Sequence, residues 1–138
     1  MSESRSVVID VGAPTPEAVA ANAEERSLLI WGGISYLLHL LVALAAVIPG
    51  ASVSIAVLII ALVMDLVKKD DAVGTWHASH FSWRISSVLW AGVLYTVTIP
   101  AFFLGLFVFN PAWVLISGWF LWRIVKGMVR MNQNKEIY

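Results

Sequence analysis

Four long apolar runs dominate this sequence, at about residues 28–48, 51–67, 85–109 and 112–128. The hydrocarbon core of a bilayer is about 30 Å thick, and about 20 apolar residues in a helix cross it. The runs lack the two-residue alternation of a strand, and a lipid-facing sheet would have to close into a barrel. The runs therefore predict four transmembrane helices.

The composition agrees with a membrane protein. Of the 138 residues, 59% are hydrophobic and 13% are charged, which is too much apolar surface for a soluble domain of this length to bury. The absence of cysteine excludes disulfides, thiolate nucleophiles and thiolate metal ligands. A formal net charge of zero gives no reason to expect nucleic acid. We expect an all-α polytopic membrane protein whose partners are the lipid bilayer and either other membrane proteins or further copies of itself.

Turn signals divide the runs into pairs. Pro49-Gly50 separates the first two runs, and Asn110-Pro111 separates the last two. This pattern predicts two helical hairpins. The second run is short for a span, but the side chains of Lys68-Lys69 can snorkel and extend it. Pro100 predicts a kink in the third helix.

The basic residues indicate the orientation. None of the nine lies in the two tight turns between paired runs. With four spans, the N-terminal segment, the middle loop and the C-terminal segment share one side, and the positive-inside rule makes that side the cytoplasm. The basic residues are Arg5, Arg26, Lys68, Lys69, Arg84, Arg123, Lys126, Arg130 and Lys135.

The two ends of the chain are polar. Residues 1–26 contain acids and two prolines and lack the apolar core of a secretory signal, so they predict a disordered cytoplasmic tail. Residues 27–130 form the predicted four-helix transmembrane domain. Residues 131–138 form a second cytoplasmic tail.

The aromatic stretch "TWHASHFSWR", residues 75–84, separates the two predicted hairpins. Read as a helix that continues into the next run, it places Trp76, His80, Trp83 and Ser87 on one face. Tryptophan favours the headgroup region because its ring is apolar and its N–H is polar. The stretch predicts a cytoplasmic interfacial helix over about 72–84, with Arg84 reaching lipid phosphates. The predicted anchors are Trp76, His77, His80, Phe81, Trp83 and Arg84.

An alternative reading of this stretch is a metal or catalytic site at His77 and His80. Asp70 or Asp71 could add an oxygen ligand, but zinc usually takes at least three protein ligands and His39 lies too deep to join. No nucleophile with an orienting acid accompanies these histidines. A haem held by two histidines would need a second histidine at the depth of His39, and the sequence has none. We therefore expect no cofactor, no metal and no catalytic residue.

Four histidine or charged residues fall inside the predicted spans: His39, Asp65, Arg123 and Lys126. Counted from the outer turns at 1.5 Å per residue, Asp65 lies about 21 Å deep, Arg123 about 17 Å and Lys126 about 21 Å. An unpaired charge at that depth is costly, so an ion pair of Asp65 with Arg123, or with Lys126 as the rival partner, is one expectation. Separate snorkelling to the cytoplasmic surface is the alternative. His39 is expected to bond across the bundle, to Tyr36, Tyr95 or Thr96.

Small residues can let helices approach closely. Gly32-Gly33 beside Tyr36 predicts a packing notch on the first helix. The remaining glycines in the runs form no GxxxG pair within a span. They are Gly92, Gly105, Gly118 and Gly127.

Two segments resemble a known group of proteins. "KKDDAVGTWHASHFSWRISS" and the later "WRIVKG" resemble small uncharacterised inner-membrane proteins of proteobacteria, over about residues 28–134. That group is distantly similar to the four-helix, channel-like subunit of the chloroplast inner-envelope import machinery. The resemblance implies a four-span helical fold in the bacterial inner membrane, and it implies no particular activity. The group tends to carry asparagine at the position of Asp65, which implies that this charge is not essential to it.

Three functions remain open. The first is a non-enzymatic accessory or scaffold subunit of a membrane complex, indicated by the small size and the absence of a catalytic set. The second is a small channel- or translocon-like protein acting as an oligomer, for which the spans offer only His39, Tyr95, Thr96 and Thr98 as lining. The third is a membrane metal protein or enzyme that uses His77 and His80.

Overall fold

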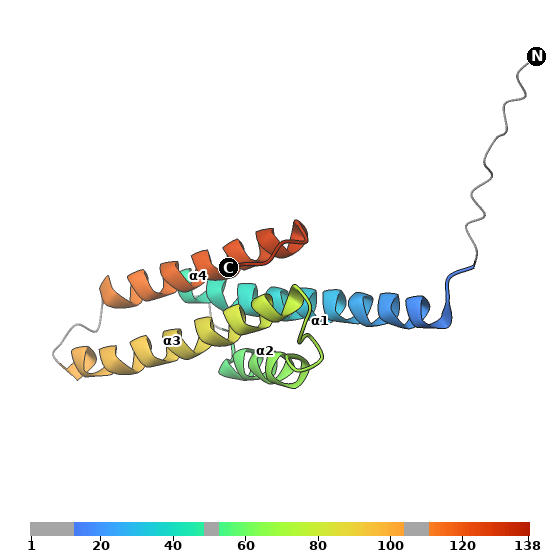
Figure 1. The fold of residues 1–138 in the computed structure, drawn as a ribbon. Helices are drawn as coiled ribbons and strands as arrows, with labels where there is room; N and C mark the ends of the chain where they lie inside the picture. The colour runs from blue at the N-terminus through green and yellow to red at the C-terminus, as the bar shows by residue number, and fades with distance from the viewer. Residues whose placement is uncertain (1–12, 49–52, 104–110) are drawn as a thin grey trace, which may run out of the picture.

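The chain folds into helices throughout the part that the structure describes. The structure is a computed structural model and describes residues 13–48, 53–103 and 111–138. No strand occurs within these ranges, so the prediction of an all-α fold is confirmed. The helices, labelled in Figure 1, are α1 (Pro16–Val47), α2 (Ile55–Lys68), α3 (His77–Phe103) and α4 (Pro111–Asn132).

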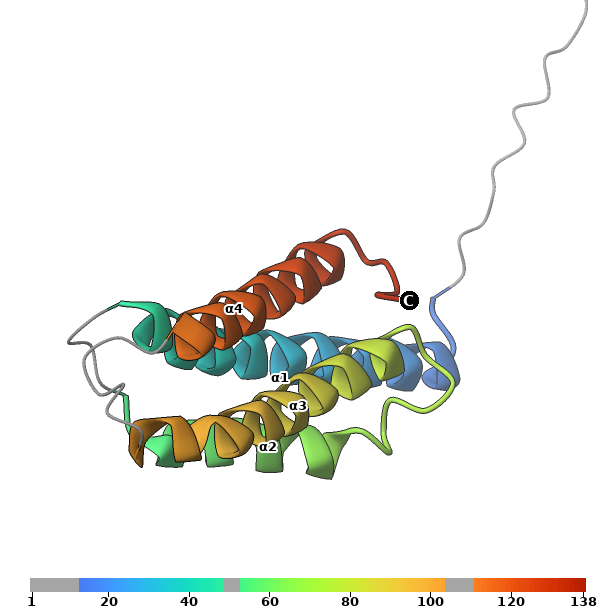
Figure 2. The same cartoon turned by 90° about the vertical axis from the view of Figure 1, so that its left-hand side faces the viewer.

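The helices lie side by side, and the direction of the chain alternates from each helix to the next (Figure 2). Helix α1 contacts both α2 and α4, and α4 also packs along α3. The beginnings of α1 and α3 and the ends of α2 and α4 therefore lie at the same end of the bundle.

Helix α1 begins earlier than the sequence analysis predicts. The Thr15 hydroxyl accepts a hydrogen bond from the backbone N–H of Ala18 at 3.3 Å, and Pro16 occupies the first turn. Residues 16–26 therefore belong to a capped helix, and the prediction that they are disordered is wrong. Residues 13–26 are exposed, and the first turns of α1 project beyond the other helices (Figure 1). Residues 1–12 of the predicted tail lie outside the described residues.

Two of the described helices, α1 and α4, are long and apolar enough to cross a membrane. At 1.5 Å per residue, the 32 residues of α1 extend about 48 Å and the 22 residues of α4 about 33 Å. Helix α2 has 14 residues and extends about 21 Å. Helix α3 has 27 residues and contains Pro100.

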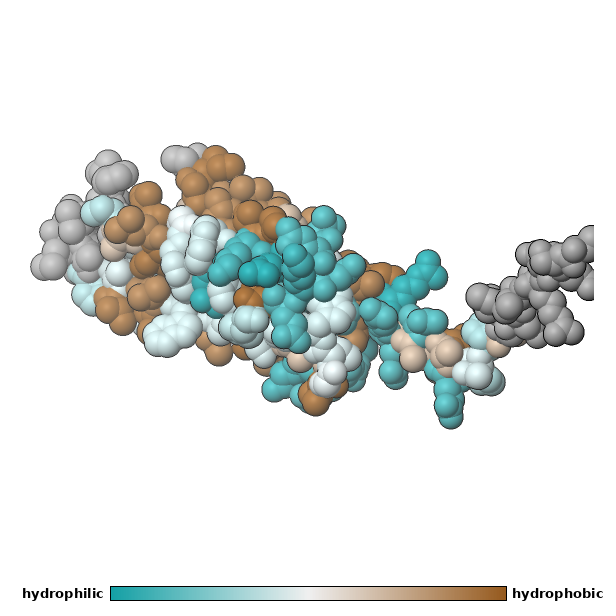
Figure 3. All heavy atoms as spheres, turned by 45° about the horizontal axis from the view of Figure 1, so that its top comes forward, coloured by the Kyte–Doolittle hydropathy of each residue, from teal (hydrophilic) through white to brown (hydrophobic). Residues whose placement is uncertain are grey.

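The outer surface of the bundle is unusually apolar, and several polar side chains lie in its core beside apolar ones. Ser35, His39, Asp65, Arg84 and Ser87 are each 0% exposed. Large apolar side chains cover the outside instead, and Figure 3 shows them along the bundle, with hydrophilic residues gathered towards the end where α1 begins. Exposed examples are Ile30, Leu37 and Leu41 of α1, Ile59 and Val63 of α2, Leu89, Val93 and Val97 of α3, and Val114, Leu115 and Val129 of α4.

The predicted interfacial helix over 72–84 is not a separate element. Residues 69–76 form turns, in which Gly74 has φ +82°, and His77 begins α3. Residues 77–84 of the aromatic stretch therefore form the first two turns of α3. Trp76 is half-buried, and the other five predicted lipid anchors are buried inside the protein. Their assignment to the lipid surface is wrong because they are covered by other parts of the protein: Arg84 bonds α2, His80 bonds α1 and the C-terminal segment, and Trp83 donates to the Arg123 carbonyl of α4. These residues are His77, His80, Phe81, Trp83 and Arg84.

Helices α1 and α4 meet at a glycine. A Cβ atom on Gly127 would lie 2.8 Å from Cε1 and Cζ of Tyr36 and still closer to the tyrosine hydroxyl. A Cβ on Gly32 would meet the flexible Met131 side chain at 2.8 Å, and one on Gly33 would meet nothing within 4 Å. The notch predicted at Gly32-Gly33 thus involves only Gly32, and the closer helix approach is at Gly127.

Candidate functional site

A buried ion pair joins α2 to α3. The Arg84 Nε lies 3.0 Å from both carboxylate oxygens of Asp65, and Nη2 lies 2.8 Å from Oδ1. Both side chains are 0% exposed. This two-pronged contact uses the planar donor geometry of arginine, and it holds the two charges in a fixed relative orientation.

Helix α1 adds two side chains to the same carboxylate. The Ser35 hydroxyl donates to Asp65 Oδ1 at 2.7 Å. His39 Nδ1 lies 2.8 Å from the Ser35 carbonyl, which can only accept, so Nδ1 carries the proton. His39 Nε2 then lies 3.9 Å from Asp65 Oδ2 and has no hydrogen-bond partner in the described part of the chain. Three helices therefore meet at one carboxylate.

Aromatic rings enclose the guanidinium of Arg84. Its Cζ lies 4.3 Å from the ring centroid of Tyr36 and 4.5 Å from that of Phe81. Desolvated cation–π contacts of this kind are attractive. Arg84 Nη1 is buried and, among the described residues, has no hydrogen-bond partner. Arg84 is thus an internal cation and does not reach lipid phosphates.

A second polar chain joins α1, α3 and the C-terminal segment through His80. The Tyr36 hydroxyl lies 2.9 Å from His80 Nδ1, and His80 Nε2 lies 2.9 Å from the carbonyl of Lys135. Because the carbonyl can only accept, Nε2 carries the proton and Nδ1 accepts from Tyr36. Burial lowers the pKa of His80 from its ordinary value of 6.5, which favours this neutral form.

The C-terminal segment turns back onto α3. Asn134 has φ 52°, the N–H of Asn134 donates to the Met131 carbonyl, and the N–H of Lys135 donates to the Arg130 carbonyl. These two bonds end α4 in a Schellman motif, in which asparagine takes the left-handed position. The returning chain buries Ile137, which is 5% exposed and whose N–H donates to the Ser79 hydroxyl at 3.2 Å.

Arg123 and Lys126 do not pair with Asp65, so that prediction is wrong. Arg123 Nε donates to the Ser87 hydroxyl at 2.7 Å, and its Cζ lies 3.7 Å from the Trp83 ring centroid. Lys126 Nζ lies 5.2 Å from the Trp83 ring centroid and 5.2 Å from that of Trp122. Depth along a helix does not fix which face a side chain occupies, and the rotation of α4 turns both cations towards aromatic rings.

The polar partners predicted for His39 are also engaged elsewhere. Tyr36 bonds His80, and the Tyr95 hydroxyl lies 2.7 Å from that of Ser117 on α4. Thr96 donates to the carbonyl of Gly92 in its own helix. Sequence reasoning missed Ser35, whose position one helical turn before His39 was the available signal.

The described residues contain no group of three histidine or acidic side chains arranged to hold a metal. Both ring nitrogens of His80 already take part in hydrogen bonds. His77 stacks on Trp76 with ring centroids 3.8 Å apart, and its Nε2 is buried without a partner in the described chain. His77 and His80 are therefore not brought together as a pair of ligands.

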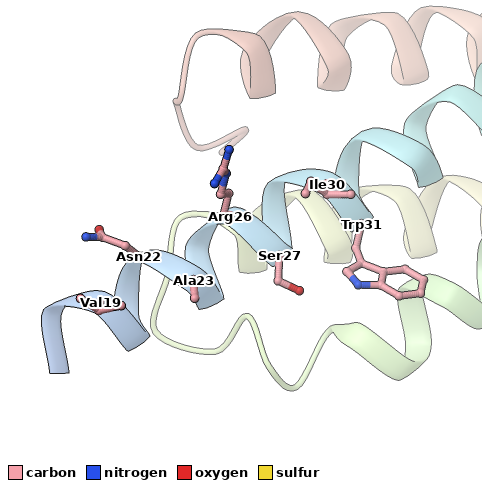
Figure 4. Close-up of a pocket in the computed structure, with 7 residues that line it drawn as sticks. All are labelled: Val19, Asn22, Ala23, Arg26, Ser27, Ile30 and Trp31. Atoms are coloured by element: carbon pink, nitrogen blue, oxygen red, sulfur yellow. The ribbon is translucent and has the colours of Figure 1, made fainter. Parts of the chain in front are cut away.

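The surface of α1 carries a shallow hollow of about 610 Å³. Figure 4 shows its lining residues, and Trp31 and Arg26 leave opposite sides of the helix. All of the lining side chains come from α1, so this hollow lies along one helix and is not a cavity between helices. They are Val19, Asn22, Ala23, Arg26, Ser27, Ile30 and Trp31.

The arrangement around Asp65 and His80 binds helices to one another. Ser35, Asp65 and Arg84, and likewise Tyr36, His80 and the Lys135 carbonyl, are joined by hydrogen bonds between helices or to the C-terminal segment, which suits a structural role. The resemblance to small proteobacterial inner-membrane proteins stays a prediction. Comparison with known protein families, curated proteins and solved structures finds no match to this chain.

Proposed function

We propose that this chain is a four-span protein of the bacterial inner membrane that acts as a non-enzymatic accessory or scaffold subunit of a larger membrane complex. The observation that carries the proposal is the apolar outer surface of the bundle, together with the polar side chains buried inside it. Its buried polar side chains join helices to one another, and its outer surface is apolar. Such a surface is suited to lipid and to the helices of other membrane proteins.

Four crossings account for the position of the charges. Because the chain direction alternates, Arg26 before the apolar part of α1, Lys68 at the end of α2 and Arg130 at the end of α4 fall at one end of the bundle. In two membrane-spanning hairpins this end is cytoplasmic by the positive-inside rule. Helix α2 is about 21 Å long, and the Lys68 and Lys69 side chains lengthen its reach towards the headgroups.

The accessory role rests on how the buried polar groups are used. Asp65 and Arg84 neutralise each other, Tyr36 and His80 bond each other, and Arg123 is held by Ser87. These groups join the helices of the protein itself and leave the outer apolar faces for other helices. The exposed first turns of α1 project from the cytoplasmic end, where a soluble part of a partner could contact them.

Purification in a mild detergent tests this function. The chain carries a C-terminal tag, is expressed at its native level, and co-purifying proteins are identified and quantified. We expect a membrane protein to co-purify in a fixed ratio, and a reciprocal purification through that partner to recover this chain. A homo-oligomer without a partner that conducts ions in liposomes would contradict the accessory role and support a channel.

A further inference from the structure

Two cations on α4 have no anionic partner in the described part of the chain. Arg123 and Lys126 lie three residues apart, on one face of the helix. Neither forms an ion pair within the described ranges, where Arg84 takes the carboxylate of Asp65. The two side chains therefore give this part of α4 a local charge of about +2.

Both cations lie against the same aromatic ring. The Trp83 ring centroid is 3.7 Å from Arg123 Cζ and 5.2 Å from Lys126 Nζ. The Trp122 ring, which is 55% exposed, lies 5.2 Å from the same ammonium group. We call these four residues the α4 cation patch. The cation–π contacts hold the two charges in place without neutralising them.

Some of the N–H donors of the patch are free and accessible. Arg123 Nε donates to the Ser87 hydroxyl at 2.7 Å and Nη2 to that of Ser86 at 3.0 Å, whereas Nη1 donates to no group in the described chain. Lys126 Nζ likewise makes no hydrogen bond to a described residue. Both side chains are only partly buried, and neither Arg123 Nη1 nor Lys126 Nζ is enclosed by protein. A ligand on the outside of the bundle can therefore contact both groups.

The place of the patch in the proposed span determines the kind of ligand. Counted from the outer turn, Arg123 lies about 17 Å and Lys126 about 21 Å into a hydrocarbon core of about 30 Å. Basic side chains at such depths reach the nearer headgroups by extending towards them and by thinning the bilayer locally. These are the headgroups of the cytoplasmic leaflet. The exposed side chains of Trp122 and Val125 add apolar surface beside the cations.

We propose that the α4 cation patch binds the phosphate of one anionic phospholipid from the cytoplasmic leaflet, which rests on the membrane placement proposed above. A phosphodiester carries one negative charge and two free oxygens, so it can accept from Arg123 and Lys126 together. A zwitterionic lipid fits less well, because its ammonium group would approach a patch that is already cationic. The acyl chains lie along the apolar surface of α4.

Counting bound lipids by native mass spectrometry tests the proposal. The full chain is purified in a non-ionic detergent and titrated with phosphatidylglycerol, or with phosphatidylcholine that has the same acyl chains. We expect the first phosphatidylglycerol to bind at least about fivefold more tightly than the first phosphatidylcholine. Equal affinity for the two lipids would overturn the proposal.

A water-soluble competitor separates a lipid from free phosphate. Glycerol 3-phosphate carries the phosphate without acyl chains, and in large excess it should leave the bound phosphatidylglycerol in place. Displacement of the lipid by this competitor would show that the patch takes free phosphate, and would overturn the assignment to a lipid.

A matched set of variants localises the lipid. Lys126→Gln should weaken the first phosphatidylglycerol about fivefold and leave phosphatidylcholine unchanged, whereas Lys126→Arg should keep the affinity within about twofold. Arg130→Gln removes the same charge from an exposed position on the same helix, outside the patch, and should change the affinity by less than about twofold. Equal weakening by Lys126→Gln and Arg130→Gln would show a general attraction to basic residues and overturn the proposal. Lys126 makes no hydrogen bond in the described chain, so an unchanged thermal midpoint should accompany its substitution.

This test and that of the accessory role can fail separately. Lipid binding is measured in detergent on the isolated chain, so it needs no partner protein. Loss of the preference for phosphatidylglycerol would leave the co-purification result unaffected. Absence of a co-purifying partner would refute the accessory role and leave the lipid preference unaffected.

Discussion

The guanidinium of Arg84 on α3 holds the carboxylate of Asp65 on α2 by Nε at 3.0 Å and Nη2 at 2.8 Å, and both side chains are fully buried. Ser35 from α1 donates to the same carboxylate at 2.7 Å. An ion pair with this geometry offsets much of the cost of removing two charges from water. Loss of either partner leaves the other as an unpaired buried charge. Removal of one partner should therefore cost more than the pair itself contributes to stability.

Asp65→Asn and Arg84→Gln should each lower the free energy of unfolding of the bundle by about 3–5 kcal/mol. The double variant should lose less than the sum of the two single changes, because it leaves no unpaired charge. Unfolding by SDS in mixed micelles, followed by circular dichroism, measures all three variants. Additive losses would show that the two residues do not interact.

The same measurement shows which of the two arginines, Arg84 or Arg123, interacts with Asp65. Arg123 donates to the Ser87 hydroxyl at 2.7 Å and stacks on Trp83, with no contact to Asp65. Asp65→Asn and Arg123→Gln should therefore be additive within about 0.5 kcal/mol. A coupling energy as large as that between Asp65 and Arg84 would contradict the arrangement of α4.

The positions of the helices follow from the sequence, whereas the pairing of the charges does not. The apolar runs predict the four helices because their length and lack of alternation exclude strands, and Asn110-Pro111 and Pro49-Gly50 separate them. The extension of α1 to Pro16 had its signal in Thr15, which caps the helix. The polar composition of residues 1–26 instead favoured the prediction of disorder.

Residue counting gave Asp65 and Arg123 similar depths, but it carries no information about helix rotation. Arg84 lay in an aromatic stretch that suits a membrane surface equally well, so its burial depended on the packing of α1 and α2 against α3. The periodicity of His80, Trp83 and Ser87 did predict a common face. The structure turns that face towards protein, and all three side chains are buried.

Gly127→Ala should destabilise the contact between α1 and α4. The added methyl group would lie 2.8 Å from two ring carbons of Tyr36, which is packed on all sides, so we expect a loss of about 1–3 kcal/mol. Gly118 is the matched control on the same helix, since nothing lies within 4 Å of a Cβ there. Gly118→Ala should be neutral or raise the stability by up to about 1 kcal/mol through helix propensity. Equal effects of the two changes on the thermal midpoint would contradict the contact.

The stability of the docked C-terminal segment should depend on pH through His80, which precedes the span proposed from residue 85. Neutral His80 accepts from Tyr36 and donates to the Lys135 carbonyl. Burial, with the charge of Arg84 acting in the same direction, lowers the pKa of His80 below 6.5 in the folded protein. Its contribution is therefore complete above about pH 6.5 and is lost as the pH falls towards the lowered value.

Thermal midpoints at pH 7.5 and 5.5 measure this dependence. The wild-type protein should be less stable at pH 5.5, and His80→Gln should reduce the difference. A part of the difference between the two thermal midpoints should remain in this variant, because burial also lowers the pKa of His77. An unchanged difference in the variant would exclude His80 as the titrating group.

The most direct test of the account is the side of the membrane on which each end of the bundle lies. The chain contains no cysteine, so single cysteines can be introduced without background labelling. Ser54 is the exposed residue just before α2, and Asp70 lies exposed in the turns after it. With the chain in a bacterial inner membrane, a membrane-impermeant maleimide should label Ser54→Cys in intact spheroplasts and Asp70→Cys only after permeabilisation. Labelling of both positions from the same side, or of Asp70→Cys alone in intact spheroplasts, would contradict the four-span arrangement with cytoplasmic termini.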